Sequence, residues 1–384
     1  MGDRTVPAGR PIFDPGAEKY RGKVLIPAGC SLPGGGGTGN ALVKASSLDY
    51  DVAWQEVTCR PVGPTCPWVG YAQSVQIASA TPIVVSGNHA YIGSFFDEYV
   101  TTWNIADPST LAQLQWVTDP ALGYLNDMAL SGTTLFATSE NGYVVSIDVS
   151  NPNAPSIISV WTAPFGYSFD GIAISGTVAF LANWGDDAIT ALDISNPASM
   201  SEISSLQDLT FFNGAYGIRI VGNIAVMTAV SGTNYVSTID ISNPAAMVRR
   251  DSVTDASFTD LFQVAVDGNT AYVSDYQANG GRVHSIDITD PTNISILDTL
   301  THPSISGPIG ISVDPANARL YVASAWNPHV VGISIANPAA MAVTGFVTDA
   351  TYITTPWGIT HQGDYVYVAD NDGRFYSIEK ACLG

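Results

Sequence analysis

The sequence is poor in basic residues and lacks the features of several common protein classes. Its 384 residues include 14 Lys plus Arg against 34 Asp plus Glu, a formal net charge of -20. Because nucleic acid and anionic membrane surfaces attract Lys and Arg, this balance argues against both as partners. No run approaches the roughly 20 consecutive apolar residues of a membrane-spanning helix, so no membrane insertion is expected. Residues 1–7 contain no apolar stretch of a secretory signal, so conventional export is not expected either.

Residues that would mark a metal site or a catalytic centre are also scarce. The five histidines are scattered without ligand spacing, and neither a CxxC pair nor a nucleophile-elbow, HExxH or P-loop motif occurs. Asp370-Asn-Asp-Gly373 resembles the start of a calcium loop but lacks the distal Glu, which favours a turn. Cys59 and Cys66 are close enough to bridge, and free thiols are an equally good interpretation. We expect no metal, no cofactor and no catalytic residue, and therefore no enzyme.

What the sequence has in abundance is repetition. The phrase Leu/Ile-Asp-Ile/Val-Ser-Asn-Pro recurs in six copies, with prolines spaced 44, 45, 47, 47 and 47 residues apart, and a degraded seventh copy begins at Ile378. Before each copy stands a second phrase of the type Asp-Gly-Asn-x-Ala-Tyr-Val. Each unit contains four short apolar runs separated by turn residues, which is typical of a propeller blade. A solenoid of strand units is the alternative, although it usually has shorter periods and distinct caps.

The two ends of the repeat array indicate that it closes into a ring. The last unit lacks its fourth strand, and the unassigned strand Gln73-Ser-Val-Gln-Ile-Ala78 stands before the first unit. If that strand completed the last blade, the open edge of the sheet would be removed. The sequence therefore predicts an all-β fold, a seven-bladed β-propeller over residues 70–384 that follows an extended, irregular N-terminal arm over residues 1–69.

The repeated phrases resemble those of the LVIVD-repeat propellers over about four-fifths of the chain. The resemblance implies the fold and says little about function, because propellers support unrelated activities. The aspartate of the first phrase recurs at one place in successive blades, as Asp148, Asp193, Asp240 and Asp287. Repetition of this kind predicts a structural hydrogen bond rather than a catalytic carboxylate.

The N-terminal segment differs from the body in charge and in pattern. Residues 1–60 hold seven basic and six acidic side chains, whereas residues 61–384 hold seven and 28. A stretch that begins at Gly39 resembles a segment of tailed-bacteriophage head fibres and some tail fibres. The matching positions are Leu42, Lys44, Ser46, Asp49, Tyr50, Asp51 and Trp54. The resemblance implies that residues 1–60 dock on phage capsid or tail proteins in a virion, with a homo-oligomer such as a trimer left open. A linker hairpin is the alternative interpretation.

The segments that lead into the first strand of each unit vary between units and predict a ligand-binding face. In propellers this part of the chain lines one end of the central channel, and aromatic rings beside carboxylates and amides suit contacts with glycans or proteins. The candidate residues are Asn126, Asp127, Phe169, Asp170, Tyr216, Phe262 and Trp357. Packing between neighbouring blades is the alternative role for each of them.

These observations lead to three functional hypotheses. The first is a structural virion protein of a tailed phage, a head-fibre, capsid-decoration or tail-fibre protein that displays the propeller for attachment to host glycans or proteins. Many copies would then supply avidity. The second is a bacterial cell-surface or periplasmic binding protein with LVIVD repeats. The third is a propeller enzyme that acts on polysaccharide.

Overall fold

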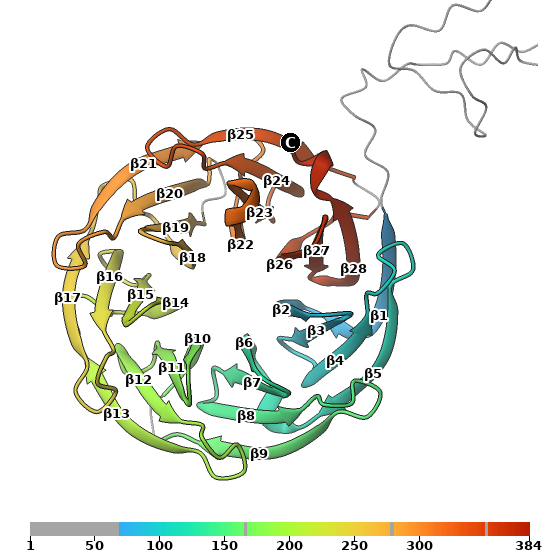
Figure 1. Ribbon diagram of the computed structural model, residues 1–384, viewed down its shortest axis with the longest axis horizontal. Coiled ribbons are helices and arrows are strands. Elements are labelled where there is room, and N and C mark those ends of the chain that lie inside the picture. The colour runs from blue at the N-terminus through green and yellow to red at the C-terminus, as the bar shows by residue number, and fades with distance from the viewer. Residues whose placement is uncertain (1–68, 165–166, 277–279, 350–351) are drawn as a thin grey trace, which may run out of the picture. The chain divides into compact units, whose positions relative to one another are not determined.

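The chain forms a ring of β-sheets. The computed structural model describes residues 69–164, 167–276, 280–349 and 352–384, which belong to the unit Cys66–Gly384. In these ranges 28 strands make seven antiparallel sheets of four strands each. Figure 1 shows the sheets arranged as blades around a central axis. The predicted seven-bladed β-propeller is confirmed, and the predicted arm lies outside the described residues except for residue 69.

Each blade takes four strands, numbered here from the innermost to the outermost. Blades 1 to 3 are β2 (Ala80–Ser86), β3 (His89–Ser94), β4 (Tyr99–Asn104), β5 (Ala112–Thr118); β6 (Leu125–Ser131), β7 (Thr134–Ser139), β8 (Tyr143–Asp148), β9 (Ser156–Thr162); and β10 (Phe169–Ser175), β11 (Val178–Asn183), β12 (Ala188–Asp193), β13 (Ser201–Gln207). Blades 4 to 6 are β14 (Ala215–Val221), β15 (Ile224–Ala229), β16 (Tyr235–Asp240), β17 (Val248–Val253); β18 (Leu261–Asp267), β19 (Thr270–Asp275), β20 (Arg282–Asp287), β21 (Ser295–Thr301); and β22 (Pro308–Asp314), β23 (Arg319–Ser324), β24 (His329–Ser334), β25 (Ala342–Val347). Blade 7 is β26 (Pro356–Gln362), β27 (Tyr365–Asp370), β28 (Asp372–Glu379) and β1 (Gly70–Ala78).

Burial differs between the inner and outer strands of a blade. The second and third strands of a blade have both faces covered by neighbouring blades, so they are buried over four or more consecutive residues, as in β11 and β12. The fourth strand has one face in solvent, so its burial alternates residue by residue, as in β9 and β13. Hydrophobic clusters lie between successive blades, for example Phe180 of blade 3 against Ile218 of blade 4. The core is therefore a ring of interfaces between blades.

The predicted closure of the ring is confirmed. Strand β1 pairs antiparallel with β28, with Gly70 opposite Ser377 and Tyr71 opposite Tyr376. The strand that precedes blade 1 thus becomes the fourth strand of blade 7, and no blade is left one strand short.

A second series of contacts joins the blades at the Asn-Pro turns. In six of the seven junctions a Ser or Thr hydroxyl of one blade donates to the carbonyl oxygen of the turn proline of the next blade, at 2.6–2.8 Å. The pairs are Thr102–Pro152, Ser146–Pro197, Ser204–Pro244, Thr238–Pro291, Ser285–Pro338 and Ser377–Pro108. At the seventh junction Thr344 donates to the carbonyl of Leu383 at 2.5 Å. The degraded last repeat therefore keeps the contact without the proline.

The recurring aspartates have the structural role that the sequence predicts. The carboxylates of Asp148, Asp193, Asp240 and Asp287 each accept a hydrogen bond at 2.8–2.9 Å from the backbone N–H two residues later. These bonds fix the turn that carries the proline. Hydrogen bonds to the charged form lower the pKa of all four carboxyl groups, and with the added contact of Arg250 the pKa of Asp240 falls to about 2.

Helical structure is a minor part of the described chain. It consists of the 3-10 turns η1 (Pro120–Leu122), η2 (Pro315–Asn317) and η3 (Lys380–Cys382). Among the described residues no helix has the length or the apolar character to cross a membrane. Cys382 in η3 is disulfide-bonded.

Candidate functional site

The two ends of the central channel carry different sets of loops. Every innermost strand begins at one end, which also carries the turns between second and third strands and the connections from one blade to the next. We call it the acidic end. The other end carries the turns between first and second strands and the Asn-Pro or Asp-Pro turns, and we call it the proline end.

Charge distinguishes the two ends. Where the structure describes them, the loops of the acidic end hold ten carboxylate side chains and no Lys or Arg. These residues are Asp97, Glu98, Asp119, Glu140, Asp186, Asp187, Asp208, Asp255, Asp260 and Asp349. The loops of the proline end hold only Asp107, Asp290 and Asp364, together with Lys380. The carboxylates of the loops are therefore concentrated at one end of the channel.

Exposed apolar side chains follow the same division. Among the described residues six large exposed hydrophobic side chains lie in loops, and all six belong to the acidic end. They are Phe96, Tyr124, Trp184, Leu209, Trp326 and Tyr352. The others lie on the outermost strands. Contiguous exposed apolar groups on a soluble protein mark an interaction site more often than scattered ones do, so the acidic end is the candidate functional face.

Five of the aromatic rings at this end form one continuous series across blades 3 to 6. The rings are Trp184, Tyr216, Phe262, Tyr276 and Trp326, with successive centroid distances of 6.2, 4.7, 4.9 and 5.8 Å. Trp184 and Trp326, at the two ends of this aromatic series, are 39% and 58% exposed. A second group, Phe95, Phe96 and Tyr124, packs edge to face at the junction of blades 1 and 2.

Trp326 takes its position because Gly307 has no side chain. Gly307 has φ +60°, and a Cβ at this residue would lie 1.6 Å from Cδ1 of Trp326. The indole therefore lies directly on the backbone of the connection between blades 5 and 6.

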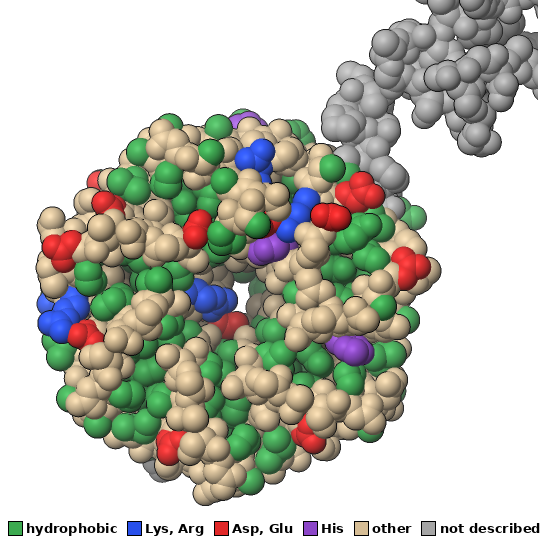
Figure 2. Space-filling model, in the orientation of Figure 1, with side chains coloured by type: hydrophobic (Ala, Val, Ile, Leu, Met, Phe, Trp, Pro, Cys, Tyr) green, Lys and Arg blue, Asp and Glu red, His purple; other side chains and the backbone are tan. Residues whose placement is uncertain are grey.

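The wall of the channel carries an ion pair between blades that are not neighbours. Arg219 of β14 contacts Asp127 of β6 through Nη1 and Oδ2 at 3.1 Å. The same carboxylate oxygen accepts the backbone N–H of Ile172 in the intervening blade at 3.2 Å. Asp127 thus holds three blades together. Figure 2 shows basic and acidic side chains together on the wall of the central opening.

Asn126 and Asp170 lie beside this pair and join it to Glu140. The amide nitrogen of Asn126 donates to Oδ1 of Asp170 at 2.7 Å and to Oε1 of Glu140 at 3.0 Å. Asp170 is only 3% exposed, and its Oδ2 has no hydrogen-bond partner. Burial, followed by the negative charge of Glu140, raises the pKa of Asp170 well above its ordinary value.

Two of the other predicted residues belong to the aromatic series. Tyr216 and Phe262 occupy the second position of β14 and β18, and their ring centroids are 4.7 Å apart. Burial, then the charges of Asp170, Glu140 and other nearby carboxyl groups, raise the pKa of Tyr216 well above its ordinary value. Trp357 holds the same position in β26, and its buried Nε1 has no hydrogen-bond partner.

The structure places Phe169 in the core. Its side chain is fully buried and packs against Trp161 and Tyr167, with centroid distances of 5.9 and 5.7 Å. The pairing of β10 with β11 shifts register between Phe169 and Gly171. Asp170 is therefore the channel residue of this strand, and Phe169 packs behind it.

Trp184, Tyr276, Trp326, Glu140 and Arg219 were not among the predicted residues. The first four lie in or beside turns between second and third strands. The aromatic residue that directly follows the second strand in blades 3 and 5 is the signal that would have found two of them. The seven positions of the fibre-like segment, from Leu42 to Trp54, lie outside the described residues.

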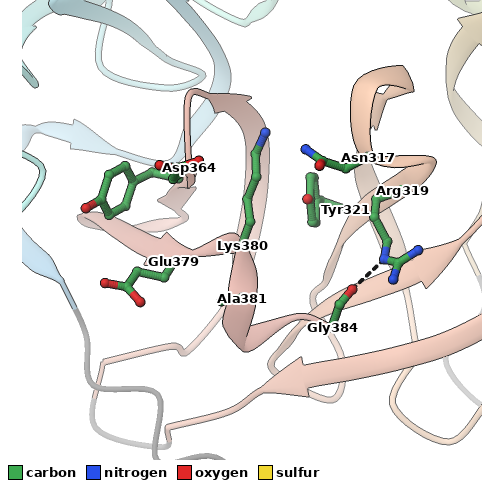
Figure 3. Close-up of a pocket in the computed structure, with 9 residues that line it drawn as sticks. Asn317, Arg319, Tyr321, Asp364, Glu379, Lys380, Ala381 and Gly384 are labelled. Carbon is green, nitrogen blue, oxygen red and sulfur yellow. Dashed lines mark hydrogen bonds between the residues drawn. The ribbon is translucent and has the colours of Figure 1, made fainter.

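A cavity of about 510 Å³ lies at the proline end between blades 6 and 7 (Figure 3). Its two cations already have partners, because Lys380 donates to Asp314 at 2.5 Å and Arg319 donates to the carbonyl of Gly384. Asp314 is 2% exposed; burial opposes its ionisation, but hydrogen bonds from Asn317 and Lys380 lower its pKa. Both cations of the cavity wall are therefore already engaged by groups of the protein.

No site for a metal ion is formed by the described residues, in which no group of three His, Cys, Asp or Glu is placed to hold one. The chemistry that the acidic end can offer is therefore stacking on aromatic rings, hydrogen bonding by amides and carboxyls, and attraction of positive charge.

Comparison with known proteins identifies the repeat. The LVIVD repeat family matches residues 77–117, 122–162, 166–208, 218–255 and 356–376. The first four matches fall on blades 1 to 4 and the last on blade 7, and blades 5 and 6 have the same four-strand arrangement. LVIVD repeats are therefore present, as the sequence predicted. The family matches begin at residue 77, so the resemblance of the N-terminal segment to phage fibres stays a prediction.

Solved structures share the fold at low sequence identity. A chain in the crystal structure of a mitotic checkpoint complex is 14% identical, with a TM-score of 0.66 over 88% of this chain and 99% of that chain. A functionally unknown protein from Desulfotomaculum acetoxidans is 12% identical, with a TM-score of 0.60 over 76% and 90%. The computationally designed Ika8 protein is 12% identical, with a TM-score of 0.56 over 81% and 99%. These similarities concern the fold alone. No curated protein matches the chain.

Proposed function

We propose that this LVIVD-repeat propeller is a non-catalytic attachment protein that binds its ligand at the acidic end. The observation that carries the proposal is the aromatic series from Trp184 to Trp326, which combines five rings with nearby carboxyl and amide groups at one end of the channel. Rings of this kind supply contact area at low cost in conformational entropy, while the polar groups set specificity.

The position of β1 supports a division between attachment and binding. Gly70, the first residue of β1, lies against the carbonyl of Pro108, a turn residue of the proline end. The N-terminal part of the chain therefore joins the propeller at the end opposite to the aromatic series. A protein held through its N-terminal residues can in this way present the acidic end to a partner.

We propose that the protein is attached to a tailed-phage virion, with residues 1–60 docked on capsid or tail proteins. This part of the proposal rests on the segment Leu42 to Trp54 and on the near-neutral charge of residues 1–60. A cell-surface protein with LVIVD repeats would use the same propeller in the same orientation, and experiment has to separate the two.

The test compares the full chain with a variant that lacks residues 1–60, each mixed with particles of a phage whose genome encodes the protein. We expect the full chain to co-sediment with the particles and the truncated chain to stay in solution with an unchanged circular dichroism spectrum. Truncated protein that still co-sediments would refute the anchor, and full-length protein found only in host cell envelopes would favour the cell-surface role.

Ligand binding is tested separately, with cells or isolated envelope fractions and the substitutions Trp184→Leu and Trp326→Leu. Both residues are exposed in the free protein, so we expect the two substitutions to leave the fold intact. Loss of adhesion in the double variant is the expected result. Adhesion equal to that of the unchanged protein would show that the binding surface lies elsewhere. Release of soluble saccharide from the envelope would show that the protein is an enzyme rather than an attachment protein.

A further inference from the structure

Part of the negative charge of the acidic end has no cationic partner, although Arg249 pairs with Asp208 and Arg282 with Asp275. Of the carboxyl groups around the aromatic series, Asp127 has Arg219 as an ion-pair partner. Within the part of the chain that the structure describes, neither Glu140, Asp170 nor Asp260 contacts a Lys or Arg. Three acidic groups without a cation therefore surround the channel mouth at blades 2, 3 and 5.

Two of these groups, Glu140 and Asp170, are held close together by Asn126. The single amide nitrogen of Asn126 bridges Glu140 and Asp170, so the two carboxyl groups are neighbours. Oδ2 of Asp170 is buried without a hydrogen-bond partner. An unpartnered buried carboxyl group is unfavourable, since its desolvation is not compensated. A positively charged group placed between Glu140 and Tyr216 would compensate it.

The aromatic rings beside these carboxyl groups favour the same kind of ligand. Tyr216 packs against Trp184 at 6.2 Å and against Phe262 at 4.7 Å. The faces of aromatic rings carry negative charge density and attract ammonium and guanidinium groups. Rings combined with carboxylates are the arrangement by which proteins recognise such cations, whereas an anionic ligand would be repelled and a neutral sugar would leave the carboxyl groups uncompensated.

Resting on the proposed function, we infer that the acidic end recognises an organic cation, a primary ammonium or guanidinium group, held between the Glu140–Asp170 pair and the rings of Trp184 and Tyr216. The cation is a Lys or Arg side chain of a partner protein or the amino group of a small molecule. In either case the binding chemistry is the same, and the positive charge of the ligand is what the protein selects.

The experiment measures binding of the full chain by calorimetry to three probes. They are a peptide with four Lys, the same peptide with Gln at those positions, and n-butylammonium. A neutral oligosaccharide is the fourth arm. We expect the Lys peptide to bind at least about tenfold more tightly than the Gln peptide, with binding that weakens as salt is added. Binding of n-butylammonium at comparable strength would identify a small amine as a sufficient ligand.

Two variants locate the site. Glu140 is exposed, so Glu140→Gln removes a charge without disturbing the core, and we expect a loss of about tenfold in affinity for the Lys peptide. Asp107→Asn makes the same change of charge at the proline end, where Asn stands at the equivalent position of other blades, and should change affinity less than about twofold.

The outcomes separate this inference from the proposed function. Equal binding of the Lys and Gln peptides, or unchanged binding after Glu140→Gln, overturns the inference. If the neutral oligosaccharide alone binds and Trp184→Leu abolishes it, the inference is wrong while the attachment function stands. If no probe binds and adhesion is independent of Trp184 and Trp326, both are wrong.

Discussion

The hydroxyl of Ser377 donates a hydrogen bond to the carbonyl oxygen of Pro108 at 2.6 Å, across 269 residues of sequence. Ser377 is fully buried and lies opposite Gly70 in the β1–β28 ladder. One residue therefore takes part in both systems that close the ring, the strand exchange and the contacts from hydroxyl to proline carbonyl.

Replacing Ser377 by Ala should destabilise the propeller by about 1–2 kcal/mol, because the carbonyl of Pro108 loses the donor that the buried Ser377 supplies. The measurement is urea unfolding followed by tryptophan fluorescence. Ser156, which is exposed on an outermost strand, supplies the control, since Ser156→Ala should stay within about 0.5 kcal/mol of the unchanged protein. Equal unfolding midpoints for the two variants would show that the contact adds nothing.

Gly310 should tolerate no side chain. A Cβ at Gly310 would lie 2.2 Å from the carbonyl oxygen of Trp357 in the next blade, and a backbone atom cannot move aside without separating the two blades. We expect Gly310→Ala to cost at least about 2–3 kcal/mol in the free energy of unfolding. Gly87→Ala is the comparison, because Gly87 has φ +55° with no atom near its Cβ position and should cost only about 1 kcal/mol. A cost for Gly310→Ala no greater than that of Gly87→Ala would contradict this account.

Lowering the pH from 7 to about 5 should stabilise the propeller. Burial, then the charge of Asp275, raises the pKa of Asp260 to about 6. Because the folded state binds this proton more tightly than the unfolded state does, stability increases as the pH falls through the folded pKa. Thermal unfolding between pH 7 and 5 measures the effect, and Asp260→Asn should flatten the profile in this window. A profile for Asp260→Asn that keeps the original slope would contradict the assignment.

Below pH 4 the direction should reverse. The turn aspartates, of which Asp240 has a pKa of about 2, bind protons more readily in the unfolded chain than in the fold. Their contribution is present above the unfolded pKa and is lost as the pH falls through the folded one. Asp240→Asn, which keeps an acceptor for the N–H of Ser242, should show a shallower loss between pH 4 and 2. An acid transition that is as steep in the variant would exclude this carboxyl group as a contributor.

The sequence was sufficient to predict the architecture because each blade repeats its turn chemistry. The Asn-Pro phrase and the recurring Asp148 position fix where strands begin and end, and the unassigned strand before blade 1 fixes the closure. These are local signals that recur in most copies of the repeat. The match of β1 to blade 7 followed from counting strands and needed no knowledge of side-chain packing.

Side chains at the channel were harder to predict, for two physical reasons. The register shift between Phe169 and Gly171 breaks the alternation on which a strand pattern depends, so Phe169 and Asp170 could not be assigned to core and channel. The pair of Arg219 and Asp127, 92 residues apart, joins blades 4 and 2 on the wall of the channel, and no repeat pattern encodes such a contact.

The pairing of β1 with β28 has a consequence for how the protein is made. A ribosome adds roughly 5–20 residues per second, and β1 must wait for a partner about 300 residues further along the chain. For some tens of seconds after its synthesis β1 therefore has no strand to pair with, while blades 1 to 6 can already assemble from contiguous segments. The ring can therefore close only at the end of this interval. A nascent chain that stalls in blade 7 would expose β1 as an unpaired strand to other nascent chains on the same mRNA.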